Sequence, residues 1–187
     1  GFSDVAVDDN TVARIESESE KTSPARWQAL LIVGSLGVDT QAQAGMAAPG
    51  VFMMQTKSGL AYLTAVQATL LGSKPGSAMV RGNRMRSQDS LIPATEVLAV
   101  QGCLFDQNDI QVLGGDADGE LTGRVFSEHA SLANNRLVGS SERATFELTC
   151  DKTKFSVLGN LRTAPIQVNG TADNLLPPPW NTLNVAI

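Results

Sequence analysis

The sequence predicts a mainly β protein: an antiparallel sandwich or barrel-like domain, with a short apolar N-terminal segment that reads as helix and with extended terminal arms. The first observation is that short apolar runs recur about every 8–12 residues from residue 50 onward, between breaks rich in Gly, Asn, Asp and Ser. The second is the alternation within such runs. In RATFELTC, residues 143–150, Phe146 and Leu148 face one way and Glu147 the other, as in a half-buried antiparallel strand. We find no internal repeat.

The N-terminal part, residues 1–24, reads as a polar, acidic arm. Its few Val and Ile residues cannot form a core, and the run ESESEK is a solvated stretch of charge. We expect such an arm to become ordered only against a partner, and we expect that contact to use Glu16, Glu18 and Glu20.

Residues 25–49 read as an apolar segment followed by a linker. Ser23 and Pro24 suit the start of a helix, and residues 27–38 carry no charge. A membrane-spanning helix needs roughly 20 apolar residues, so this run is too short to cross a bilayer, although it has the length of the hydrophobic region of a signal peptide. Three interpretations stay open: a buried helix or strand of the domain, a membrane anchor or its remnant, and an uncleaved signal. The last two would allow membrane association through residues 27–38.

Residues 50–170 contain the predicted antiparallel strands. We read AMVRGNRMR, residues 78–86, as one strand with Arg84 and Arg86 on one face and Arg81 on the other. Three arginines so close together suit the binding of an acidic partner, such as the acidic arm of a neighbouring copy. The alternative is a basic edge strand that prevents aggregation.

Residues 171–187 read as a proline-rich C-terminal arm. Its three consecutive prolines, residues 177–179, predict an extended polyproline II segment. Trp180 follows them, and we expect it to dock on a partner. The alternative is a tail that wraps its own domain.

The two cysteines, Cys103 and Cys150, both lie in predicted strands. We expect them to form a disulfide, which would stabilise the domain and place it in an oxidising compartment. The alternative is two buried free thiols, since unpaired cysteine packs as a small hydrophobic residue.

The candidate sites for catalysis and for metals are weak. The one histidine, His129, has Ser127 nearby but no nucleophile elbow or oxyanion-loop motif, so we expect it to be a surface or half-buried residue. Alternating carboxylates in the loop GGDADGE suit calcium, but the glycine comes too early for an EF-hand and a solvated hairpin loop is the alternative. We find no nucleotide-binding motif and expect no cofactor. The carboxylates of that loop are Asp116, Asp118 and Glu120.

The composition narrows the classes of function. A net charge of −5 argues against general binding of nucleic acid, which needs a basic surface. Low charge and much Ser, Thr, Asn, Gln and Gly suggest an extracytoplasmic protein of the periplasm or cell envelope, or a virion protein. We therefore expect a non-enzymatic structural or assembly subunit that binds other protein subunits, as a homo-oligomer or in a larger assembly. Its setting would be a cell-envelope machine of the secretion or conjugation type, or a viral coat. A secreted ligand- or calcium-binding β-module is the alternative.

Overall fold

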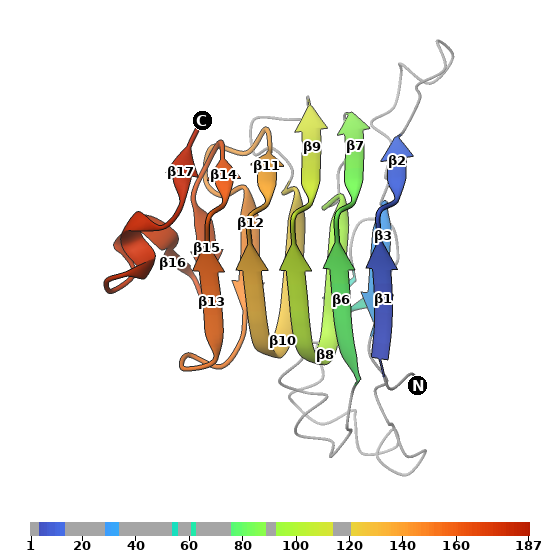
Figure 1. The fold of residues 1–187 in the computed structure, drawn as a ribbon, viewed down its shortest axis with the longest axis horizontal. Coiled ribbons are helices and arrows are strands. Elements are labelled where there is room, and N and C mark those ends of the chain that lie inside the picture. Colours follow the sequence, from blue (N-terminus) through green and yellow to red (C-terminus); the bar gives the residue numbers. More distant parts are fainter. Residues whose placement is uncertain are drawn as a thin grey trace.

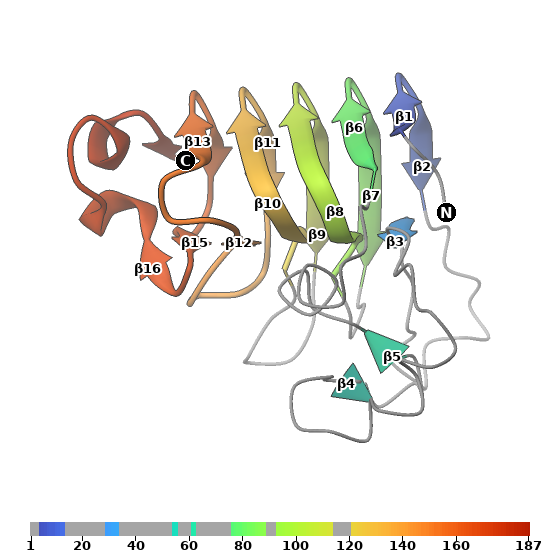
Figure 2. The same cartoon turned by 90° about the horizontal axis from the view of Figure 1, so that it is seen from below.

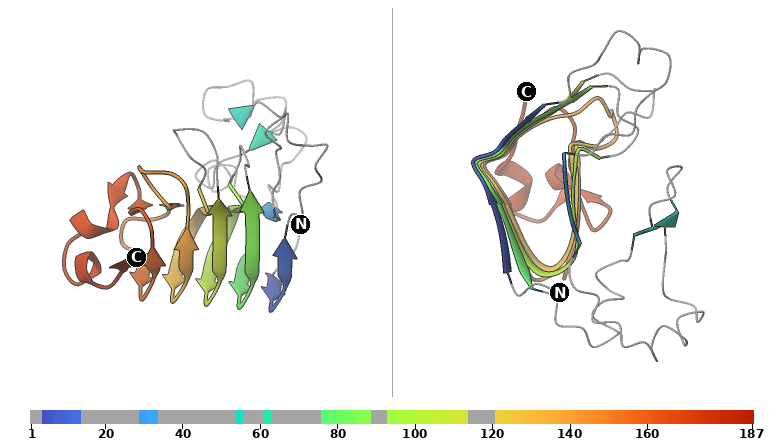
Figure 3. Two further views of the ribbon diagram at one scale, coloured as in Figure 1. Left: turned by 90° about the horizontal axis from the view of Figure 1, so that it is seen from above. Right: turned by 90° about the vertical axis from the view of Figure 1, so that its right-hand side faces the viewer.

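The computed structural model describes residues 4–13, 29–33, 54–55, 61–62, 76–88, 93–113 and 121–187. These residues are mainly β, and their strands wind in successive coils around one axis (Figure 1). Each full coil has three faces. Viewed along the axis, the strands of successive coils overlay one another (Figure 3).

Each face is a stack of parallel strands. Face one contains β1 (Asp4–Asp8), β6 (Ser77–Arg81), the second half of β8 (Thr95–Asp106), the second half of β10 (Gly123–Ala133) and β13 (Phe155–Leu158). Face two contains β2 (Thr11–Ala13), β7 (Arg84–Gln88), β9 (Asp109–Leu113), β11 (Arg136–Val138), β14 (Leu161–Arg162) and β17 (Val185–Ala186). Face three contains β3 (Leu30–Val33), the first halves of β8 and β10, β12 (Phe146–Thr149) and β15 (Ile166–Val168).

The pairing makes this fold a parallel β-solenoid, and the prediction of an antiparallel domain is wrong. Among the described strands, only β15 with β16 (Thr171–Ala172) and β4 (Met54–Gln55) with β5 (Ala61–Tyr62) pair antiparallel. The reason is that the next strand along the chain continues on the next face of the same coil. It meets a strand of its own face only one coil later, and then in parallel. The described strands form neither a sandwich nor a closed barrel.

The described part of the apolar N-terminal segment is strand and not helix. Leu30–Val33 form β3, which pairs in parallel with β8, and Ile32 is buried in the core. For these residues the core interpretation is therefore right. The rest of the 27–38 run lies outside the described residues. Within the described part of the chain, no helix is long and apolar enough to cross a membrane.

Both terminal segments contribute coils, in contrast to the arms that we expected. Residues 4–13 form β1 and β2 of the first coil, while the rest of the acidic arm lies outside the described residues. Residues 171–187 form β16, the short 3₁₀ helices η2 (Asp173–Leu175) and η3 (Trp180–Thr182), and β17. The prolines lie in a turn, with a cis bond between Pro178 and Pro179, in place of the expected polyproline II segment.

Apolar side chains of successive coils stack inside the solenoid. One interior row runs in register through five strands of face one and contains no polar residue. The Phe105 ring of this row also meets the Phe146 ring of face three, with the centroids 5.2 Å apart. The burial of these rows explains why the alternation of Phe146 and Leu148 was visible in the sequence. The row consists of Val7, Val80, Phe105, Leu132 and Val157.

A ladder of asparagines turns the chain from face one to face two in every coil. The residue before each of the first five ladder asparagines has a positive φ, between 53° and 67°. Gly82 is one of these residues, and a Cβ there would collide with the side chain of Asp9. From Asn83 onward the ladder positions follow one another at 25, 27, 25 and 24 residues, so a repeat is present that we missed in the sequence. The ladder consists of Asn10, Asn83, Asn108, Asn135, Asn160 and Asn184.

The segment that contains η2 and η3 covers the last coil, and we call it the cap (residues 169–183). Figure 2 shows it at one end of the stack of strands. Its Trp180 ring lies 5.7 Å from the ring of Phe155. Its Asp173 carboxylate is 2.7 Å from the Arg162 guanidinium, and both side chains are buried. A terminal unit that packs over the last coil in this way closes the core of a solenoid.

Candidate functional site

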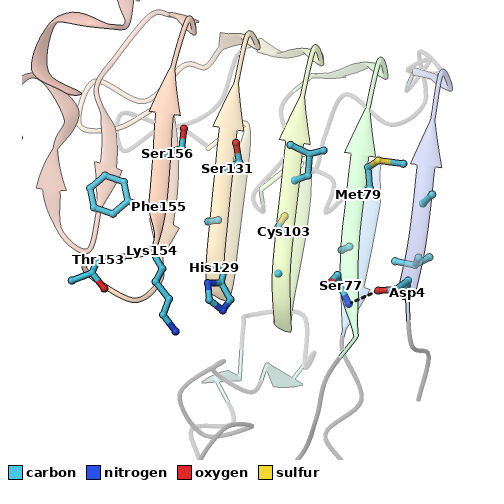
Figure 4. Close-up of a pocket in the computed structure, with 16 residues that line it drawn as sticks. Asp4, Ser77, Met79, Cys103, His129, Ser131, Thr153, Lys154, Phe155 and Ser156 are labelled. Atoms are coloured by element: carbon cyan, nitrogen blue, oxygen red, sulfur yellow. Dashed lines mark hydrogen bonds between the residues drawn. The ribbon is translucent and has the colours of Figure 1, made fainter. Parts of the chain in front are cut away.

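A shallow groove of about 950 Å³ crosses the outside of face one, over β1, β6, β8, β10 and β13. Figure 4 shows Ser77 of β6, His129 of β10 and Lys154, which directly precedes β13, along one margin. The groove floor is mostly apolar, and Met79 and Leu104 contribute to it. Because every coil adds one strand about 4.8 Å from the last, the groove suits an extended ligand that runs along the axis.

One end of the groove carries a small charged cluster. The Lys154 ammonium donates a hydrogen bond of 2.8 Å to the Glu128 carboxylate, which is also 3.3 Å from the His129 Nε2 atom. The hydrogen bond from Lys154 lowers the pKa of Glu128, and the same bond raises the pKa of Lys154. The backbone N–H of Thr153 lowers the pKa of Asp151 nearby. These side chains are exposed, so the cluster contributes surface charge and little stability.

His129 and Ser127 lie on opposite sides of the chain. Ser127 is buried, and its hydroxyl donates to the His129 carbonyl at 2.8 Å, whereas the His129 ring is exposed. The two side chains are therefore not arranged as a nucleophile and a base. A regular strand would place Glu128 and His129 on opposite sides, but the alternation of β10 breaks between them, so that both lie outside while Ser127 and Ala130 on either side are buried.

The two cysteines are free thiols in the structure. Cys103 lies on β8 and points into the core, where burial raises its pKa to about 12. Cys150 follows β12, and burial raises its pKa to about 11. Both thiols are therefore protonated and unreactive at neutral pH. The expected disulfide stays a prediction, and titration of thiols in the unfolded chain tests it.

Face three carries a row of charged side chains on its outer surface. Arg124 lies between two carboxylates in register, 3.5 Å from Glu96 and 2.8 Å from Glu147. The Glu96 side chain is only 1% exposed although it lies on the outer side of its strand. Next to this row, a smaller cavity of about 370 Å³ is lined by Arg143, Glu147, Gln167 and others.

The three arginines that we predicted to bind a partner do not share one strand. The turn at Gly82 and Asn83 separates Arg81 on face one from Arg84 and Arg86 on face two. All three are exposed. Arg81 is 3.9 Å from Asp106, and Arg84 is 3.9 Å from Asp109, so both pair with the next coil of their own chain.

The other predicted contact residues divide into two groups. Trp180 of the cap packs against Phe155 of β13, so the structure places Trp180 on its own domain. The remaining candidates lie outside the described residues: Glu16, Glu18 and Glu20 of the acidic arm, and Asp116, Asp118 and Glu120 of the GGDADGE loop.

The first coil presents the edges of three strands. Within the described residues, β1 pairs only with β6, β2 only with β7, and β3 only with β8. The exposed side chains of Asp8 and Asn10 lie at this edge, which we call the open edge. We did not identify the open edge from the sequence. From Asn83 onward, Asn returns every 24 to 27 residues after a turn-forming residue, and this repeat would have indicated a stack of coils with a first edge.

The described residues contain no group of three or more His, Cys, Asp or Glu side chains placed to hold a metal ion. Comparison with protein-family models, with curated proteins and with solved structures finds no match to this chain.

Proposed function

We propose that this protein is a non-enzymatic structural subunit of a larger assembly and that the open edge of its first coil is the contact. The observation that carries the proposal is the asymmetry of the two ends. The cap packs against Phe155 and Arg162 of the last coil, where the two-residue strand β17 keeps one unpaired edge, whereas β1, β2 and β3 all have strand edges without a partner among the described residues. Exposed strand edges template pairing with another chain.

We place this assembly in a cell-envelope machine of the secretion or conjugation type, with a viral coat as the alternative. The low charge and the many Ser, Thr, Asn, Gln and Gly residues support an extracytoplasmic setting.

Sedimentation of the chain in an extract of its native cells tests the proposal. We expect the wild-type chain to sediment well above its mass of 19.7 kDa. Asp8→Arg at the open edge should shift it to the monomer position, and Leu104→Lys in the groove should not. A wild-type chain that sediments as a monomer would remove the proposal.

A ligand-binding module is the second candidate, and the groove on face one favours it. The hydrophobic dye ANS tests whether the groove binds apolar molecules. If it does, dye fluorescence should fall when Met79 and Leu104 are replaced by Lys and should be unchanged in Asp8→Arg.

A further inference from the structure

The asparagine ladder has a direction, and its first end is an acceptor. Asn10 N–H donates to Asn83 Oδ1 at 3.0 Å, and Asn83 N–H donates to Asn108 Oδ1 at 3.0 Å. Each Oδ1 thus accepts from the asparagine one coil earlier. The Oδ1 atom of Asn10 has no such partner among the described residues, and its side chain is exposed. An incoming asparagine N–H would complete it.

The amide nitrogen of the same residue does not make the contact to a preceding coil that the inner asparagines make. Asn83 Nδ2 donates to the Val7 carbonyl at 2.7 Å, and Asn108 Nδ2 donates to the Val80 carbonyl at 2.9 Å. In both cases the acceptor lies three residues before the asparagine of the preceding coil. Asn10 Nδ2 instead reaches only Asp8 of its own strand and Asn83. The carbonyl of a parallel strand that carries its own ladder asparagine would take the place of the Asp8 carbonyl and make Asn10 like the inner asparagines.

The charges of the outer row specify the side chain beside that asparagine. The position two residues before the first three ladder asparagines is acidic at Asp8, basic at Arg81 and acidic at Asp106, and these three residues are in register. Arg81 lies 3.9 Å from Asp106. Like charges directly opposite each other destabilise a sheet. A strand that adds to β1 should therefore carry a basic residue opposite Asp8.

A second copy of this chain does not fit the open edge. Two copies joined edge to edge would bring the acidic residues Asp4, Asp8 and Asp9 of both together, and they would join two acceptor ends of the ladder. A head-to-tail copy meets the cap, which Figure 1 shows extending beyond β17 at the other end of the solenoid. A strand from a different polypeptide meets neither obstacle.

We infer that the open edge binds one coil of a β-solenoid from another protein, in parallel register. That coil carries asparagine over Asn10 and a lysine or arginine over Asp8. The inference rests on the proposed function and deepens it, because it specifies the chemistry of the partner strand.

A peptide of residues 76–88, GSAMVRGNRMRSQ, is the probe, because it contains a ladder asparagine with arginine two residues before it. Fluorescence anisotropy of the labelled peptide, titrated with the full chain, measures binding. We expect saturable binding that weakens at least tenfold when the peptide carries Asn83→Ala. The chain variant Asp8→Arg should weaken binding of the original peptide by a similar factor, and the peptide variant Arg81→Asp should restore binding to that chain.

The matched control is Asn174→Ala, an exposed asparagine in the cap, which should leave peptide affinity unchanged. Thermal unfolding shows that each chain variant is folded. Absence of saturable binding, or equal affinity for wild type and Asp8→Arg, would overturn the inference and leave the sedimentation result of the native assembly untouched. Light scattering that reveals self-association abolished by Asp8→Arg would overturn it too, and would support the assembly function with a second copy as partner.

Discussion

Each inner asparagine of the ladder does several structural tasks at once. Asn108 is buried; its backbone N–H and its Nδ2 both donate to Asn135 Oδ1, and its Nδ2 also reaches the Val80 carbonyl. Its own Oδ1 accepts from the backbone and the side chain of Asn83. A buried donor or acceptor that loses its partner costs free energy, because water cannot replace that partner.

Replacement of Asn108 by Ala should therefore lower the free energy of unfolding by roughly 2–4 kcal/mol, since several buried groups lose partners together. Urea unfolding followed by circular dichroism measures this change. Asn174→Ala is the control, and as an exposed substitution it should change stability by no more than about 0.5 kcal/mol. Equal effects of the two substitutions would contradict the structural role of the ladder.

Cys103 makes stability depend on alkaline pH in the reduced protein. Its pKa is raised from 9.0 to about 12 by burial, so the folded state holds its proton while the unfolded state releases it above pH 9. The unfolded state then binds fewer protons, and stability falls as pH rises through the window from 9 to 12. The slope from this thiol is about 1.4 kcal/mol per pH unit.

Urea unfolding at several pH values between 8 and 11 tests this expectation. Cys103→Ala should show a flatter loss of stability above pH 9 than the wild type, whatever its stability at neutral pH. Parallel curves for the two proteins would show that this thiol does not titrate as its burial requires.

At the scale of elements, the cap depends on one buried ion pair. Arg162 projects from β14 to the interior, where Asp173 at the start of η2 accepts its Nε–H at 2.7 Å. The second oxygen of this carboxylate accepts the Ile166 N–H at 3.3 Å. One carboxylate therefore joins the cap to faces two and three.

Asp173→Ala should destabilise the protein by about 3–5 kcal/mol, because it leaves the Arg162 charge buried without its partner. The control removes Arg136 from its exposed pair with Asp109, at 3.0 Å, and should cost no more than about 1 kcal/mol. Thermal unfolding by calorimetry compares the two. A small effect of Asp173→Ala would mean that the cap is not fixed by this pair.

The strands themselves were largely predictable, and their pairing was not. The stretch TEVLAVQGCLF corresponds to β8 and FELT to β12, because alternation and β-branched residues report local burial. Whether two strands pair in parallel depends on the length of a whole coil, which local patterns do not report. The breaks before Asn108 and Asn135 therefore resembled ordinary turns between strands, and the corner at Asn83 was read as the middle of one strand, although all three are ladder corners.

The candidate site was less accessible from the sequence than the strands. The groove on face one brings together Ser77, His129 and Lys154, which are far apart in the chain and share no motif. Arg81, Arg84 and Arg86 were predicted to lie on one strand and to bind a partner; they are exposed, but the corner at Asn83 places them on two faces. For Trp180, the sequence indicated an aromatic ring that needs a contact, but it did not indicate that Phe155 of the same chain provides that contact.

At the scale of the whole molecule, contacts connect neighbouring coils, as in other solenoids. An end coil then has one neighbour where an inner coil has two, so its backbone should open more readily. We expect backbone amides of residues 4–13 to exchange with deuterium faster than those of residues 101–113 in the isolated protein. Hydrogen exchange read by mass spectrometry measures the difference, and equal protection would mean that the open edge is covered.

The cap on the last coil has a consequence for stoichiometry. If the open edge binds a coil of another protein, as we infer, the combined stack of coils, or column, would grow at the first coil and end at the cap, so identical copies of this chain would not propagate into an endless fibre. Each column would then contain a single copy, at its terminus. The cell would set the number of columns by how much of this chain it makes, and their length by whatever precedes it.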